Sequence, residues 1–159
     1  MKTLILGLGN PLVSDDSAGL RVAAELKARL ADRPEIEVGE DYWGGLRLME
    51  RLVGYDLAVI IDAIRSGAPP GTIHHLAPDS LPTQRSASAH DVNLPTALAL
   101  GRQAGLHLPD DGHIRLVGIE AADILNFAET CTPAVAAAVP LAVEAVLQVL
   151  ASFAEEAPV

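Results

Sequence analysis

The sequence predicts an α/β sandwich built around a mostly parallel sheet. Two runs without a polar side chain, Leu4–Leu8 and Leu57–Ile61, are typical of strands buried on both faces. Segments of helical periodicity alternate with the strands, and right-handed crossovers place such helices on the faces of a parallel sheet. A chain of 159 residues suffices for one core, so we expect a single domain at 1–154 and a frayed tail at 155–159.

The first half of the chain alternates strand and helix. Apolar residues at helical spacing predict a helix from Gly19 to about Leu30, with basic residues near its end. Ile36 and Val38 mark a short second strand. The segment Leu46–Leu52 is predicted to be a short helix that precedes the second buried strand.

In the second half we expect a turn at Gly67–Gly71, an edge strand at Thr72–Leu76 and a polar loop at 78–89. A helix from His90 to about Ala104 and a strand at His113–Ile119 are expected to follow. The last helix has Thr132 as its N-cap and Pro133 in its first turn. Pro140 should kink or split this helix, because proline removes a backbone donor.

Composition limits the possible partners. The formal net charge of −10 argues against nucleic acid and anionic membrane surfaces. The single cysteine, Cys131, excludes an internal disulfide framework and fits a reducing cytoplasm. We expect no signal peptide and no membrane span, because charge or proline interrupts each apolar run of about 20 residues.

The first strand ends in a short acidic loop. Gly7 and Gly9 allow a tight turn and a close backbone approach at the carboxyl end of the strand, the edge where open α/β sheets bind ligands. Asp15 and Asp16 follow. Capping of the next helix needs only one side chain, so we assign Asp15 to the cap and Asp16 to the cleft.

Two further residues could complete a site with Asp16. Asp62 directly follows the second buried strand, where it either faces the cleft or caps the next turn. His90 precedes a helix, where it is either an exposed histidine or a neutral imidazole able to bind metal. Two oxygens and one nitrogen suit Zn, Ni or Mn with positions left open for a substrate.

The segment Tyr42-Trp43-Gly44-Gly45 contains the only tryptophan of the chain. An aromatic pair before two glycines is either a lip that binds another protein or a hydrophobic staple for the following helix.

Five short motifs resemble, in order, those of the hydrogenase maturation proteases, which process the large subunit of nickel-iron hydrogenases. The resemblance covers nearly the whole chain and rests on these segments: Gly7-Leu8-Gly9-Asn10 with Asp15-Asp16 and Gly19, Ile60-Ile61-Asp62-Ala63, His90-Asp91-Val92-Asn93-Leu94, Leu116-Val117-Gly118-Ile119-Glu120, and Leu125 through Thr132-Pro133. Each motif alone is weakly specific, whereas the ordered set is strongly specific.

The resemblance implies a three-layer α/β/α sandwich of the phosphorylase/hydrolase-like type. It also implies that Asp16, Asp62 and His90 contact a metal. We hypothesise that Asp16 and Asp62 are catalytic, and that one of these carboxylates, or a metal-bound water, activates the attacking water. The carboxylate and metal roles are not separable from sequence. The metal is nickel, held partly by the large subunit precursor, although Zn or Cd could occupy the same ligands. The implied reaction removes a carboxyl-terminal peptide after nickel insertion.

One departure concerns the loop after the second strand, where Glu40 to Gly45 replaces an Asp-Gly-Gly-Thr-like sequence of many members. That loop is linked to the choice of hydrogenase.

Three other interpretations fit parts of the sequence. The opening Gly-Leu-Gly-Asn-Pro also resembles peptidyl-tRNA hydrolase, but the histidine that this family needs is missing and the acidity disfavours tRNA. A phosphate-binding Gly-x-Gly loop would need a third glycine, where this chain has Leu12. A non-catalytic nickel sensor or maturation chaperone with the same three ligands is not separable from the protease by sequence.

Overall fold

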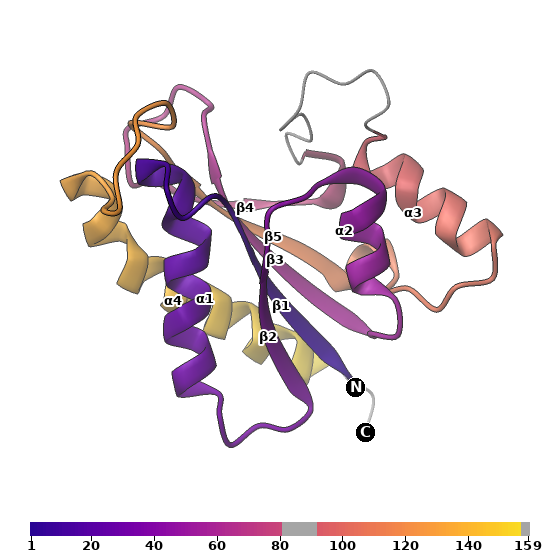
Figure 1. Ribbon diagram of the computed structural model, residues 1–159. Helices are drawn as coiled ribbons and strands as arrows, with labels where there is room; N and C mark the ends of the chain where they lie inside the picture. Colours follow the sequence, from indigo (N-terminus) through magenta and orange to yellow (C-terminus); the bar gives the residue numbers. More distant parts are fainter. Residues whose placement is uncertain (81–91, 157–159) are drawn as a thin grey trace.

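The computed structural model describes residues 1–80 and 92–156. A mixed sheet forms its centre, with the strand order β2-β1-β3-β5-β4 (Figure 1). The strands are β1 (Thr3–Leu8), β2 (Ile36–Asp41), β3 (Leu57–Ile64), β4 (Ile73–Leu76) and β5 (Ile114–Glu120). Strands β2, β1, β3 and β5 are parallel, and β4 is an antiparallel edge strand. The prediction of a mostly parallel sheet is therefore confirmed.

Helices cover both faces of the sheet, so the predicted three-layer sandwich is also confirmed. Helices α1 (Ala18–Arg29) and α4 (Pro133–Glu156) lie on one face, and α2 (Gly45–Leu52) and α3 (Leu94–Gln103) lie on the other (Figure 1). Two hydrophobic cores lie on the two faces of the sheet. Each buried strand contributes side chains to both cores, because successive side chains point to opposite faces. Ile5 packs with α1 and α4, whereas Leu4 and Leu6 pack with α2 and α3.

Two predicted boundaries are wrong. Strand β3 does not end before Asp62 but continues to Ile64, because Asp62 and Ile64 pair with Gly118 and Glu120 of β5. The helix expected directly after His90 begins at Leu94. Its N-cap is Asn93, whose side chain accepts a hydrogen bond of 2.9 Å from the backbone N–H of Thr96.

Helix α4 has the predicted start at Pro133 and is not split at Pro140. Buried residues before and after the proline, such as Val135 and Val146, pack in the same core and hold both parts in one helix. Of the described segments, α4 is long and apolar enough to cross a membrane, but its apolar stripe lies against the sheet. The helix continues through Glu156, so it includes the first two residues of the expected tail.

Close packing of glycines brings the start of α1 down onto the sheet. A Cβ atom on Gly19 would lie 2.6 Å from the carbonyl oxygen of Leu8 and 2.5 Å from that of Ile61. A Cβ on Gly7 would lie 2.4 Å from the carbonyl oxygen of Gly19. The loop before α1 is therefore fixed over the carboxyl ends of β1 and β3, and any larger residue at these positions would lift it away.

Candidate functional site

The two neighbouring acids of the loop between β1 and α1 have different surroundings. Both lie on the 3-10 turn Ser14–Ser17. Asp15 is fully buried, whereas Asp16 is half-buried. One carboxylate oxygen of Asp16 accepts a hydrogen bond of 3.0 Å from the backbone N–H of Asn10. This contact closes the loop on itself and holds Asp16 at the edge of the sheet.

Asp15 does not cap α1, and that prediction is wrong. The N-cap residue of α1 is Ser17, which makes no capping hydrogen bond through its side chain. The carboxylate of Asp15 instead accepts hydrogen bonds from the backbone N–H groups of Ala122 (2.9 Å), Asp123 (2.8 Å) and Thr132 (2.7 Å). The Thr132 hydroxyl donates to the same carboxylate. Asp15 thus fastens the acidic loop to the segment between β5 and α4.

Asp62 lies inside β3, two residues before the strand ends, and is only 4% exposed. It is paired with Gly118, and the Ile64 side chain packs against that glycine. A carboxylate at this depth near the carboxyl end of a parallel strand faces the edge at which such sheets bind ligands.

Asp16 and Asp62 belong to the same edge of the sheet. Gly19 contacts the backbone of Ile61, the residue before Asp62, and Asp16 lies three residues before Gly19. The fold therefore brings these two predicted site residues to one region. His90, the third member of the predicted set, lies outside the described residues. No group of three or more His, Cys, Asp or Glu side chains suited to a metal occurs within residues 1–80 and 92–156.

Tyr42 and Trp43 lie at the surface before α2. Their rings are 5.6 Å apart in an edge-to-face arrangement, and the Arg47 guanidinium lies 4.9 Å above the Trp43 ring. Trp43 is 49% exposed, whereas a hydrophobic staple would bury most of the ring. Gly45 has φ +60°, and a Cβ there would lie 2.6 Å from the carbonyl oxygen of Val92. This contact places the aromatic pair beside the chain that leads into α3.

A buried carboxylate that the sequence interpretation left without a role ends β5. Glu120 is 1% exposed and accepts hydrogen bonds from the backbone N–H and the hydroxyl of Ser66. The His74 ring lies 3.3 Å from the same carboxylate. Burial raises the pKa of Glu120, but the hydrogen bonds from Ser66 and His74 outweigh it, so the pKa is lowered overall. Glu120 therefore fixes the loop that follows the strand carrying Asp62.

The lowered pKa of Glu120 predicts an acid-dependent loss of stability. Its folded pKa lies below the ordinary value of 4.5, so the folded state binds this proton less readily than the unfolded chain. The stabilisation is therefore complete above about pH 4.5 and disappears as the pH falls through the folded pKa. The free energy of unfolding, measured with urea between about pH 3 and 6, should decrease less with falling pH for Glu120→Gln than for the wild type. Glu25→Gln, at an exposed position on α1, is the control, and its free energy of unfolding should depend on pH as that of the wild type does.

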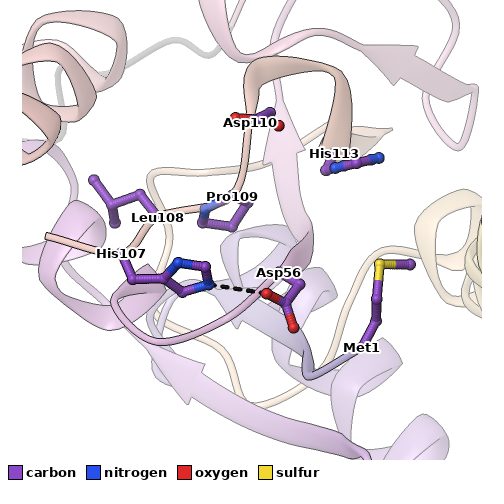
Figure 2. A pocket seen from close by; sticks show the side chains of 7 residues that line it. All are labelled: Met1, Asp56, His107, Leu108, Pro109, Asp110 and His113. Atoms are coloured by element: carbon purple, nitrogen blue, oxygen red, sulfur yellow. Dashed lines mark hydrogen bonds and ion pairs between the residues drawn. The ribbon is translucent and has the colours of Figure 1, made fainter.

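A separate cavity of about 510 Å³ lies at the opposite edge of the sheet (Figure 2). Met1, Asp56 and His113 line it, and each directly precedes or leads into a parallel strand. His107 pairs with Asp56 at 2.9 Å, as the dashed line in Figure 2 shows. The pKa of Asp56 is lowered, first by a hydrogen bond from the Lys2 backbone N–H and then by His107. This cavity is remote from Asp16 and Asp62 and takes no part in the candidate site.

Comparison with known proteins identifies relatives over almost the whole chain. A family model described as hydrogenase maturation protease matches residues 20–149. The hydrogenase 2 maturation protease of Escherichia coli K12 is 30% identical over 160 residues, which cover 99% of this chain and 95% of that protein. The hydrogenase expression/formation protein HupD of Thiocapsa roseopersicina is 27% identical, with 94% of this chain and 68% of that protein covered.

Solved structures show the same likeness. The E. coli hydrogenase maturating endopeptidase HybD superposes with a TM-score of 0.75 at 28% identity, over 96% of this chain and 94% of that one. The [NiFe] hydrogenase maturation protease HybD of Thermococcus kodakarensis gives a TM-score of 0.63 at 26% identity, over 94% of this chain and 99% of that one. The match to the family model begins at residue 20 and so leaves out the acidic loop with Asp16. The superposition on E. coli HybD covers more of the chain.

Proposed function

Because this chain belongs to the hydrogenase maturation protease family, we propose that it is the endopeptidase that removes the carboxyl-terminal peptide of a nickel-iron hydrogenase large subunit precursor after nickel insertion. The observation that carries the proposal is the position of Asp16 and Asp62 at one edge of the sheet, in a chain that is similar to named maturation proteases along its length. The single thiol of the chain fits the cytoplasm as the proposed compartment.

The chemistry needs a carboxylate that activates water. In the proposed reaction, Asp16 or Asp62 accepts a proton from a water molecule while the oxygen of that water attacks the carbonyl carbon of the scissile peptide bond. The carbon–nitrogen bond then breaks, and the same carboxyl group returns the proton to the leaving amine. The site thus needs no covalent intermediate and no further reactant.

The nickel ion belongs to the substrate in this proposal. It reaches the site within the precursor, and Asp16, Asp62 and His90 are the proposed residues of this chain that would contact it. Two carboxylates and an imidazole are suitable donors for a divalent ion, and Zn or Cd could bind the same set. When bound, the ion would hold the precursor in register with the two carboxylates, which makes removal of the peptide conditional on nickel.

The proposed function is tested with purified protein and two forms of one large subunit precursor, with and without nickel. Mass spectrometry would follow release of the carboxyl-terminal peptide. Release from the nickel-loaded form alone supports the protease. Nickel-dependent binding without release, with a precursor known to be competent, would overturn the protease in favour of a nickel sensor or maturation chaperone.

The segment Tyr42-Trp43-Gly44-Gly45 is the proposed substrate-binding lip. Trp43→Ala removes half-exposed aromatic surface and should raise KM for the precursor roughly 10-fold while leaving kcat nearly unchanged. Steady-state processing assays check this split. Leu106→Ala is the matched control, because Leu106 is 40% exposed and lies outside the aromatic pair. An unchanged KM for Trp43→Ala would remove the lip from the binding site.

A further inference from the structure

The segment between β5 and α4, residues 121–132, is held firmly against the acidic loop. Phe127 forms an antiparallel bridge with Val13, and the Ala128 N–H donates to the Leu12 carbonyl oxygen at 3.0 Å. Asp15 anchors both ends of the segment through Ala122 and Thr132. Figure 1 shows this segment, in orange, beside the start of α1.

The middle of the segment is a turn organised by Asp123. Its carboxylate accepts hydrogen bonds of 3.0 Å from the backbone N–H groups of Leu125 and Asn126, and it also accepts one from the Asn126 side chain. The backbone around Leu125 and Phe127 is therefore fixed by specific contacts on both sides.

This fixed backbone presents apolar side chains to solvent. Leu125 is 80% exposed, Phe127 is 84% exposed, and Leu12 of the acidic loop is 55% exposed. We call these three residues the apolar rim. A cluster of exposed apolar side chains is typical of a surface that another molecule covers, and an ordered backbone lowers the entropy cost of binding.

A groove of about 400 Å³ lies next to the apolar rim and shares Leu12 with it. Leu20 lines its apolar side, and Glu40 and Glu129 contribute carboxylates. The Arg21 guanidinium at this groove is already hydrogen-bonded to the Ser17 hydroxyl and the Glu129 carbonyl oxygen. The groove is therefore apolar along its length and carries an excess of negative charge.

We propose that the apolar rim and this groove dock an extended segment of the hydrogenase precursor that carries apolar and basic side chains and lies next to the scissile bond. The proposal rests on the proposed function, because it takes the precursor as the partner. Leu12 is on the same loop as Asp16, so a segment bound there continues into the candidate catalytic edge. Basic side chains complement Glu40 and Glu129.

A second copy of this chain is a poorer occupant. Each copy has a net charge of −10, so their approach through an acidic groove is opposed by repulsion. The excess charge of this chain instead favours a partner that is basic at the contact.

The test compares the double variant Leu125→Ser/Phe127→Ser with the control Leu141→Ser. Leu141 is 62% exposed on α4 and lies outside the rim, so the control removes exposed apolar surface elsewhere on the molecule. Because the rim side chains are exposed, all three proteins should have the same melting temperature. The double variant should raise KM for nickel-loaded precursor roughly 10-fold or more with nearly unchanged kcat, and the control should match the wild type.

A second variant tests the charges of the groove. Glu40→Gln/Glu129→Gln should weaken the salt dependence of precursor binding, measured with uncleaved precursor and a catalytically disabled Asp62→Asn protein. Equal KM values for the wild type and the rim variant would overturn the docking surface while leaving the protease intact. A wild-type dimer in sedimentation that the rim variant abolishes would also overturn it. Failure of the wild type to release any peptide would instead reject the proposed function.

Discussion

Asp62→Asn is expected to lower the rate of peptide release by about 10²–10⁴-fold, the range that positioned acid–base groups contribute. The change keeps the shape of a side chain that is almost fully buried near the end of β3 and removes its charge and its basicity. Because the amide cannot accept the proton of the attacking water, kcat should fall, and a rise in KM would report the loss of the proposed contact to the precursor's nickel.

The measurement is single-turnover processing of nickel-loaded precursor by Asp62→Asn and by Asp16→Asn, followed by mass spectrometry. Asp32→Asn is the control, since Asp32 is exposed in the turn after α1, at the opposite edge of the sheet. Metal affinity measured on the same variants separates a carboxylate that binds the ion from one that moves the proton. Full processing by Asp62→Asn would exclude this residue from the reaction.

Asp15→Ala is expected to destabilise the fold by about 1.5–3 kcal/mol, the range typical of hydrogen bonds to a charged group. The substitution leaves the backbone N–H groups of Ala122, Asp123 and Thr132, which are partly shielded from solvent, without their acceptor. It also releases the acidic loop from the segment before α4, so processing should fall together with stability.

Urea unfolding followed by circular dichroism measures the loss of stability. Asp15→Asn keeps one oxygen acceptor and should lose less stability than Asp15→Ala. Asp32→Ala, at an exposed position, should stay within about 0.5 kcal/mol of the wild type. Wild-type stability in Asp15→Ala would contradict the structural role assigned to this carboxylate.

Local sequence patterns were sufficient for most of the fold. The cores of β1 and β3 are continuous apolar runs, and the face of α4 has a clear helical period, so each element was predictable from its own residues. The edge that carries Asp16 and Asp62 was also predictable, because glycines and acids at strand ends indicate where an α/β sheet binds ligands.

The errors have two physical origins. The length of β3 depends on pairing with Gly118 and Glu120, and the role of Asp15 depends on Ala122 and Thr132; no local pattern contains contacts so distant in sequence. The start of α3 is different, because an asparagine followed by Leu94 and Pro95 is a helix start that is recognisable in the sequence itself.

The contacts of Asp15 also have a consequence for biosynthesis. Its partners Ala122 and Thr132 are 107 and 117 residues further along the chain. Contacts between such distant residues form late, because a long stretch of chain must first be closed into a loop. While the ribosome is still making the last quarter of the protein, the acidic loop lacks its anchor, so we expect the nascent chain to acquire protease competence only after β5 and the start of α4 have emerged and folded.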